Sequence, residues 1–267
     1  MTRFARRGLS RLMGWATDLR VPRFLRAAAY GGFARYAGAD LSEVRLAIRD
    51  FPSLGAFFVR ELKPGLRTLD PDPAALLSPV DGTVQAVGPI ERGTIVQAKG
   101  RSYAVAELCG GLEVGLDLEG GVAWTIYLSP RDYHRIHMPV TARLAAVRWI
   151  DGDRFSVAPG VLARRRVLDV NERCVLRLES EQGTFLLVLV GAMNVGRIRV
   201  LGVEPSYATE PVRPGSRFER GLEIARFEMG STIVLVAPRG VASTATHIEQ
   251  GLPVRLGSRI GTLMHPR

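Results

Sequence analysis

The sequence is poor in cysteine and has no long hydrophobic run, and both shortages exclude whole classes of protein. Cys109 and Cys174 are 65 residues apart and belong to no cluster of metal-ligating side chains, so a disulfide scaffold or a zinc ribbon is unsupported and a reducing compartment is expected. No apolar run approaches the roughly 20 residues that a membrane-spanning helix needs. Arginines interrupt every apolar stretch near the N-terminus, which argues against a secretory signal.

Lysine is also scarce. Lys63 and Lys99 are the only two, so arginine supplies almost all of the net charge of +10. Residues 1–40 hold eight arginines against two aspartates. This concentration of positive charge predicts an anionic partner, either a nucleic acid or an acidic membrane surface. With 267 residues and 46% hydrophobic content, the chain can bury one large core, with or without a helical appendage.

The N-terminal 37 residues interleave arginine with leucine and aromatic side chains at roughly helical spacing. Pro22 divides them and is expected to lie in the first turn of a second helix. Three interpretations fit this pattern: helices that lie on a lipid interface, helices packed on the core, or a cleaved organellar presequence.

The pattern changes from helical to β after residue 75. Before it, Asp40 and Ser53 are expected to cap a helix ending near residue 49 and a helix over 54–62. After it, short β-type runs are separated by Gly, Pro and Asp, with one helix candidate ending at Gly110. The fold is therefore predicted to be mainly β (α+β), a β-sandwich or partly closed barrel with helices segregated at the N-terminus. The expected strands are 83–87, 94–98, 122–128, 142–150, 174–178, 184–190, 195–203, 223–227, 232–236 and a pair within 253–263.

The stretch around which the chain is organised is residues 227–233, Phe-Glu-Met-Gly-Ser-Thr-Ile, where two predicted strand segments meet at Gly230 and Ser231. A glycine within a strand pattern indicates a bulge or a close backbone approach. A serine beside it can present its hydroxyl to the preceding carbonyl. The simpler interpretation is a β-bulge with a solvated serine.

Two further segments hold residues that can carry chemistry. His134 and His137 fall within 127–139, which is expected to form a tight non-strand turn with both imidazoles on one side. A metal site there is a weaker alternative, because no set of Cys, His, Asp or Glu supports the spacing, and no metal is expected. Asp81 lies in a Ser-Pro-Val-Asp-Gly turn, for which a structural role is the simpler interpretation. A serine, a histidine base and an orienting aspartate are nevertheless the parts of an activated nucleophile.

Five segments, taken together, resemble the phosphatidylserine decarboxylase family in sequence and in order. The resemblance runs from about residue 50 to the C-terminus. The segment with both histidines is its most distinctive part, whereas Gly-Ser-Thr alone would be weak. The segments are Phe-Phe-Val-Arg-Glu-Leu (57–62), Ser-Pro-Val-Asp-Gly (78–82), Tyr-Leu-Ser-Pro-Arg-Asp-Tyr-His-Arg-Ile-His-Met-Pro (127–139), Val-Gly-Ala (190–192) and Gly-Ser-Thr (230–232).

The resemblance implies a self-processing enzyme. In this family the serine hydroxyl attacks the carbonyl of the preceding glycine, and elimination then cuts the chain, here between Gly230 and Ser231, and leaves a pyruvoyl group at the new N-terminus. By similarity, Asp81 and His137 supply the base for this cleavage. The pyruvoyl ketone forms a Schiff base with the amine of phosphatidylserine and accepts the electrons released as carbon dioxide leaves. The resemblance suggests His134 as the acid that returns a proton to the carbanion.

The resemblance also implies a location and a set of partners. Residues 1–62 are expected to form a basic amphipathic helical region that associates with the membrane, and residues 63–267 a β-rich catalytic domain. The expected partners are phosphatidylserine, an anionic membrane surface bound peripherally on the cytoplasmic face of the cell membrane, and the other of the two self-cleaved chains, in a heterodimer. A higher homo-oligomer is left open, and no nucleic acid is expected.

Other functions stay open on the residues alone. A non-enzymatic lipoyl- or biotinyl-like binding module has flanking strands similar to 78–84 and 254–261, but Lys99, the only lysine between them, is not in a tight hairpin context. A serine hydrolase would need a Gly-x-Ser-x-Gly elbow, which is missing around Ser231. Nucleic-acid binding rests on charge alone and is weaker than either.

Overall fold

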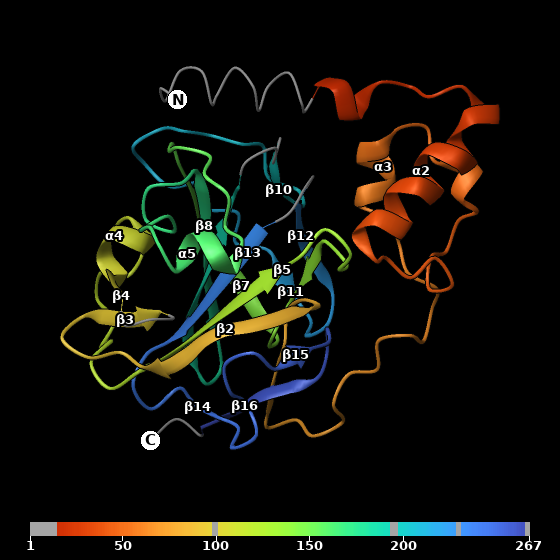
Figure 1. Cartoon of the computed structure of the whole chain (residues 1–267). Coiled ribbons are helices and arrows are strands. Elements are labelled where there is room, and N and C mark those ends of the chain that lie inside the picture. Colours follow the sequence, from red (N-terminus) through yellow and green to blue (C-terminus); the bar gives the residue numbers. More distant parts are fainter. Residues whose placement is uncertain (1–14, 98–100, 193–196, 228–230, 265–267) are drawn as a thin grey trace.

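The computed structural model describes residues 15–97, 101–192, 197–227 and 231–264. Strands dominate, and most of the helical residues precede the first strand (Figure 1). The helices are α2 (Arg23–Ala37), the 3₁₀ turn η1 (Ile48–Asp50), α3 (Leu54–Phe58), α4 (Val105–Cys109) and α5 (Pro159–Leu162). The strands are β1 (Ala75–Leu77), β2 (Gly82–Pro89), β3 (Thr94–Gln97), β4 (Arg101–Ala104), β5 (Val122–Leu128), β6 (Arg135–His137), β7 (Ala142–Ile150), β8 (Arg173–Ser180), β9 (Gly183–Val190), β10 (Ile198–Val200), β11 (Arg217–Phe218), β12 (Glu223–Phe227), β13 (Ser231–Ala237), β14 (Ala242–Thr244), β15 (Pro253–Val254) and β16 (Arg259–Leu263).

Of the two helix caps predicted in the N-terminal region, at Ser53 and Asp40, only the first forms. Ser53 caps α3 by accepting a hydrogen bond from Ala56 N at 3.1 Å, as predicted, but α3 ends at Phe58 and not at residue 62. The helix predicted after Asp40 is wrong. The Asp40 carboxylate accepts a hydrogen bond from Ser42 N at 2.8 Å, and this local turn competes with helix formation.

The largest sheet has eight antiparallel strands in the order β11-β7-β8-β9-β13-β5-β2-β15. Strand β13 lies near its centre, between β9 and β5, and all of its residues are buried. Its side chains alternate between two hydrophobic clusters, with Ile233 and Leu235 in one and Val234 and Val236 in the other. The sheet is therefore covered on both faces, which explains the nearly continuous apolar sequence of β13.

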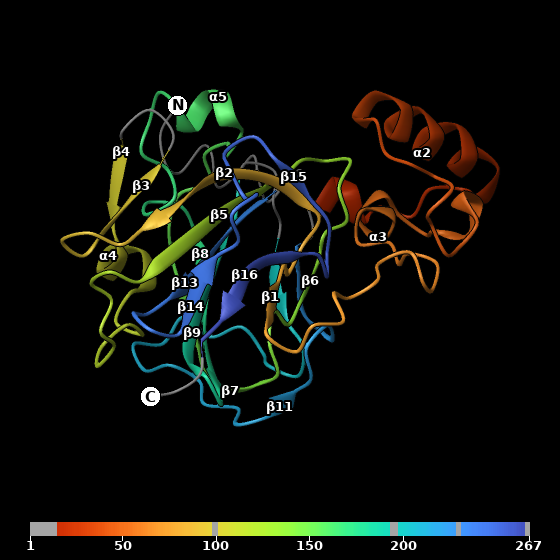
Figure 2. The same ribbon diagram turned by 90° about the horizontal axis from the view of Figure 1, so that it is seen from below.

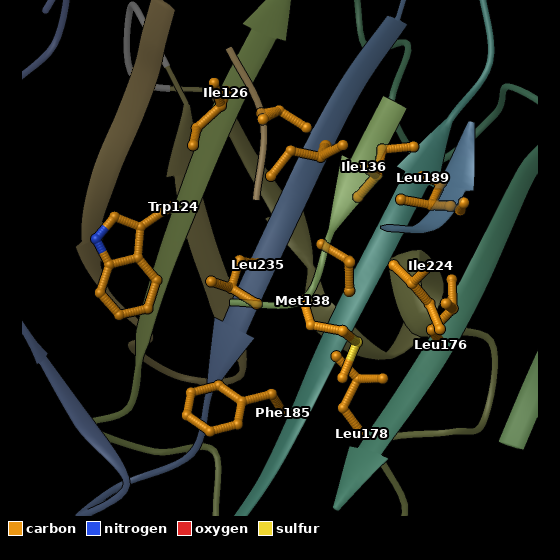
Figure 3. Packing of buried hydrophobic residues seen from close by; sticks show 14 of the residues in the cluster. Trp124, Ile126, Ile136, Met138, Leu176, Leu178, Phe185, Leu189, Ile224 and Leu235 are labelled. Carbon is orange, nitrogen blue, oxygen red and sulfur yellow. The ribbon is translucent and has the colours of Figure 1, made fainter. Parts of the chain in front are cut away.

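A second sheet, β10-β12-β6, packs on one face of the large sheet. Figure 3 shows Ile136, Met138 and Ile224 of the smaller sheet region beside Leu176, Leu189 and Leu235 of the large sheet. This pair of packed sheets, with helices gathered at the N-terminus, confirms the predicted mainly β fold class. No closed barrel is formed among the described residues.

The other face of the large sheet is covered by the β3–β4 hairpin and by α4 and α5, whose buried side chains include Tyr103, Leu108 and Leu162. A three-stranded sheet, β1-β16-β14, lies at the side where the C-terminal strands gather (Figure 2). Strands β1, β4, β6, β11 and β14 were absent from the sequence prediction, because runs of two to four residues are too short to show a period.

The N-terminal helices have a small hydrophobic core of their own, beside the β-rich body (Figures 1 and 2). Tyr30 of α2 stacks on Phe57 of α3 with ring centroids 5.8 Å apart, and Phe51 meets the same ring edge-on. Within the described residues, no helix combines the length and the apolar character that crossing a membrane would require.

Candidate functional site

Ser231 is the first residue of β13. It is fully buried and lies opposite Leu128, the last residue of β5. Its Oγ has no hydrogen-bond partner among the described residues, and neither does Oγ1 of the adjacent Thr232. The interpretation of a solvated serine is therefore wrong. Gly230, the other side of the predicted cleavage site, lies outside the described residues.

The histidine segment, residues 127–139, lies beside the strands that flank Ser231. Strands β5 and β13 pair in the large sheet, and their continuations, β6 and β12, pair in the smaller sheet. Residues 129–134 join β5 to β6. Phe227 N, at the end of β12, donates a hydrogen bond to the carbonyl of His134 at 3.0 Å. The histidine segment therefore contacts the end of β12 through His134 and pairs with the start of β13 through Leu128.

The histidine segment is partly a turn and partly a strand. Ser129 N and Ser129 Oγ each donate to a carboxylate oxygen of Asp132 at 2.7 Å, which closes the predicted turn over its first half. The second half corrects the prediction of a tight non-strand turn, since Arg135–His137 form β6. This short strand forms because β12 supplies a partner that is distant in the sequence.

His134 is a buried, neutral imidazole. Its Nδ1 lies 2.8 Å from the carbonyl oxygen of Asp132, which can only accept, so Nδ1 carries the proton. Nε2 is therefore a free lone pair, and it has no partner among the described residues. Burial lowers the pKa of His134 to about 3; the bond to Asp132 opposes this shift, and the nearby charge of Arg60 adds to it. The ring packs on Phe58 of α3, with centroids 4.2 Å apart.

His137 occupies different surroundings. Its Nδ1 donates to the carbonyl of Gly221 at 2.8 Å, and its Nε2 lies 3.2 Å from the hydroxyl of Tyr133. Burial lowers the pKa of His137, so this ring is also neutral at pH 7. It lines a cavity of about 320 Å³, which we call the His137 cavity and whose charged lining residues are Arg45, Glu61, Lys63, Arg67, Arg135 and Glu223.

Asp81 immediately precedes β2, in a turn that touches the histidine segment. His137 N donates to the carbonyl of Pro79 at 2.9 Å, so the two segments are neighbours. The next residue, Gly82, has no positive φ; it is needed because a Cβ there would lie 2.5 Å from the carbonyl oxygen of Tyr127 on β5. Asp81 lines a second cavity of about 200 Å³, the Asp81 cavity, together with Arg60, Arg67, Arg131, Asp132 and Arg255, among others.

The side chains of Asp81 and His137 are nevertheless not hydrogen-bonded to each other. The Asp81 carboxylate accepts from Nε and NH2 of Arg67, at 2.6 to 3.0 Å, and from Leu256 N at 2.8 Å. Arg67 also binds both carboxylate oxygens of Glu43. Burial lowers the pKa of Arg67, but the bonds to the two carboxylates outweigh this and raise it. Each member of the predicted Asp–His pair thus has partners of its own.

The sequence interpretation did not single out Phe58, Arg60, Arg67 or Tyr133 as members of this site. Phe58 and Arg60 lie in the segment 57–62, and Tyr133 lies in the histidine segment; both segments carry the family resemblance. Their side chains converge only because α3 docks against the histidine segment, through Arg135 Nε donating to the carbonyl of Val59 at 2.9 Å. No local pattern distinguishes a buried arginine from a surface one.

Comparison with known proteins gives one consistent result. Residues 54–262 match the family described as phosphatidylserine decarboxylase. The phosphatidylserine decarboxylase proenzyme of Alkalilimnicola ehrlichii is 40% identical over 266 residues, which cover 92% of this chain and 90% of that protein. The proenzyme of Myxococcus xanthus is 39% identical, over 96% of this chain and 94% of that protein. That of Xanthomonas euvesicatoria pv. vesicatoria is 41% identical, over 85% and 84% respectively.

Proposed function

Since the chain belongs to the phosphatidylserine decarboxylase family, we propose that it converts phosphatidylserine to phosphatidylethanolamine and carbon dioxide. The observation that carries this proposal is the buried Oγ of Ser231, which lacks a partner among the described residues; Ser231 itself lies opposite Leu128 of the histidine segment. A buried hydroxyl without a partner costs stability and calls for an explanation in function.

We propose further that Ser231 is converted to a pyruvoyl group when the chain cuts itself between Gly230 and Ser231. The position fits the group, because Ser231 starts a strand and its small polar side chain is enclosed without a hydrogen bond. A pyruvoyl group supplies a ketone that captures the substrate amine and accepts the electrons released with carbon dioxide.

The strand order supports a stable complex of the two cleaved chains. The C-terminal chain would contain β13 to β16. Three of these strands pair directly with strands of the N-terminal chain, and β14 pairs with β16. Strand β13 lies between β5 and β9, β15 pairs with β2, and β16 pairs with β1. Breaking the chain before Ser231 leaves all of these ladders in place.

The two histidines are proposed to act at different stages. His137, with Asp81, serves the cleavage step, and His134 serves decarboxylation. Replacing a carboxylate by hydrogen consumes one proton per turnover. His134 is neutral with its lone pair on Nε2, so Nε2 must take up a proton before it can return one to the substrate carbon.

The N-terminal region is proposed to hold the enzyme on the cytoplasmic face of an anionic membrane. Several of its large apolar side chains point to solvent: Phe24 is 83% exposed, Tyr36 92% and Trp15 62%. Arginines lie among them, at positions 20, 23, 26 and 35. Aromatic side chains that enter the lipid boundary beside arginines that meet acidic head groups form a peripheral anchor. The boundary between this region and the catalytic domain, at residues 62 and 63, stays a prediction.

The deciding experiment combines an intact-mass spectrum with an assay for carbon dioxide release from phosphatidylserine. We expect two chains, 1–230 and 231–267, the smaller lighter by one ammonia than a peptide that starts with serine. The Ser231→Ala protein should give one full-length mass and no carbon dioxide. An active preparation that contains only full-length chain would refute the pyruvoyl mechanism. Lys99, on which a carrier function would depend, lies outside the described residues.

A further inference from the structure

Arg60 is a buried cation with most of its hydrogen-bonding capacity unused. The side chain follows α3 and is 3% exposed. Its NH2 donates to the carbonyls of Arg131 and Asp132, at 2.6 and 3.2 Å. Nε and NH1 are buried and have no partner, and no carboxylate lies within salt-bridge distance among the described residues. Burying a charge without a salt-bridge partner costs free energy, and a bound anion would reduce that cost.

Arg173 shows what a purely structural arginine looks like in this fold. It is 6% exposed and also lacks a salt bridge among the described residues. However, its Nε, NH1 and NH2 donate to the carbonyls of Leu108, Asn171 and Glu107 respectively. Every nitrogen of Arg173 is thus engaged, and it lines neither cavity described above. The free nitrogens of Arg60 are therefore not a general consequence of burying arginine in this protein.

Arg60 lies beside the proposed catalytic histidine. Its NH2 and the Nδ1 of His134 both bind the carbonyl oxygen of Asp132, at 3.2 and 2.8 Å. Arg60 also lines the Asp81 cavity, which has room for a small group at about 200 Å³. Arg60 and His134 thus share a hydrogen-bond acceptor at the edge of this cavity.

The acidic side chains that line the same cavity already have partners. Asp81 and Glu43 bind Arg67, and Asp132 binds Ser129. Asp40 binds Ser42. Among the buried side chains that line the cavity, Arg60 has nitrogens without a hydrogen-bond partner among the described residues, so the ligand that would satisfy it is an oxyanion.

We propose that Arg60 binds the phosphodiester of the phosphatidylserine head group, an inference that rests on the proposed function. The head group offers two oxyanions, its phosphodiester and its carboxylate. A cation bound to the carboxylate would stabilise the ground state. It would therefore oppose departure of the carboxylate as neutral carbon dioxide. The phosphodiester keeps its charge throughout the reaction, and arginine is well suited to phosphate oxygens.

The test compares Arg60→Lys with the wild-type enzyme after maturation has been verified by mass. The substrate is short-chain phosphatidylserine in solution, so that vesicle binding does not contribute. We expect KM to rise on the order of 10-fold or more while kcat changes little, because the phosphodiester contact is equal in the ground and transition states. Inhibition by short-chain phosphatidylethanolamine should weaken by the same factor, since the product retains the phosphodiester.

Two kinetic outcomes would overturn the proposal. One is an unchanged KM with unchanged product inhibition. The other is a raised KM with unchanged product inhibition, which would assign Arg60 to the carboxylate. Arg173→Lys is the matched control, since it alters a buried arginine outside the cavity and should leave KM and product inhibition unchanged.

A binding measurement separates this proposal from maturation and from the proposed activity. Calorimetry compares short-chain phosphatidylethanolamine binding to the uncut Ser231→Ala protein with and without Arg60→Lys. Weaker binding of the double variant supports the phosphodiester site, and equal binding overturns it. If the wild-type protein releases no carbon dioxide from phosphatidylserine, the proposed function fails, and this comparison still decides the role of Arg60.

Discussion

The guanidinium of Arg67 binds both carboxylate oxygens of Asp81 through Nε and NH2, and it binds both oxygens of Glu43 through NH1 and NH2. Glu43 belongs to the N-terminal helical region, whereas Asp81 immediately precedes strand β2 of the β-rich body. One largely buried side chain, 9% exposed, therefore joins the two parts of the chain at the proposed active site. The hydrogen bond from Arg67 also lowers the pKa of Glu43, against the opposing effect of burial.

Removing Arg67 should destabilise the fold strongly. Arg67→Gln would leave Asp81 and Glu43 without their cation in a mostly buried site, and breaking such a pair costs about 3–5 kcal/mol. Urea unfolding of the uncut Ser231→Ala protein would measure this loss. Arg239→Gln, which breaks an exposed pair with Asp117, is the control and should cost less than about 1 kcal/mol. Equal losses in the two variants would contradict the central role of Arg67.

The proposed roles of the two histidines predict opposite phenotypes. His137→Ala and Asp81→Asn should leave the precursor uncut, since loss of either residue proposed to supply the base slows such a step on the order of 10³-fold or more. His134→Ala should be cut normally and then turn over phosphatidylserine slowly, because only proton return is impaired. Intact mass and carbon dioxide release measure the two steps separately. If His134→Ala stays uncut while His137→Ala matures, the two roles are reversed.

Low pH should destabilise the protein through the buried histidines. The native pKa of His134, about 3, lies below that of an unfolded histidine, near 6.5, so the unfolded state binds the proton first as the pH falls. The contribution of His134 to the free energy of unfolding is complete above about pH 6.5. Below that pH it declines by about 1.4 kcal/mol per pH unit, until the pH reaches the native pKa. His137, whose pKa is also lowered, acts in the same direction.

The measurement is the free energy of unfolding of the uncut Ser231→Ala protein at pH 7 and pH 5. His134→Gln in the same background should show a smaller decrease between these values, because it lacks the group that protonates on unfolding. A decrease of the same size in both proteins would show that His134 is not buried in the neutral form.

The two cleaved chains should stay together until the sheet is unfolded. Strand β13 forms ladders with β5 and β9 over most of its length, and its side chains fill both hydrophobic clusters. We expect residues 231–267 to copurify with residues 1–230 in buffer and to separate in concentrated guanidinium. Separation of the chains by size-exclusion chromatography in buffer alone would contradict the strand order described above.

Membrane binding should depend on the exposed aromatic side chains of α2 and on salt. Phe24→Ser with Tyr36→Ser should weaken sedimentation with vesicles that contain anionic lipid, and high salt should weaken it further without abolishing it. These changes should leave self-cleavage intact. They are sharper than deletion of residues 1–37, which would also remove Tyr30 from its stack on Phe57. Equal binding to neutral and anionic vesicles would show that the basic charge serves another purpose.

Much of the fold was already determined by local features of the sequence. The strands Val122–Leu128, Ala142–Ile150 and Glu223–Phe227 have the predicted bounds, because a long β-strand carries its own pattern of apolar residues between turn residues. The cap at Ser53 was likewise predictable from one residue type. Asp40 misled the prediction, because the same side chain can cap a helix or close a turn, and only neighbouring packing decides between them.

The candidate site depended on both the sequence and the tertiary structure. The sequence determined which chemical groups are present, since Ser231, His134, His137 and Asp81 could be named from their segments alone. Only the tertiary structure decided their partners, because Arg67 and Arg60 reach the site by docking of the N-terminal region on the β-rich body. Hydrogen bonds between residues tens of positions apart follow from sheet register and helix docking, and burial then sets the pKa of each histidine. No local pattern in the chain encodes these long-range hydrogen bonds or the burial of the histidines.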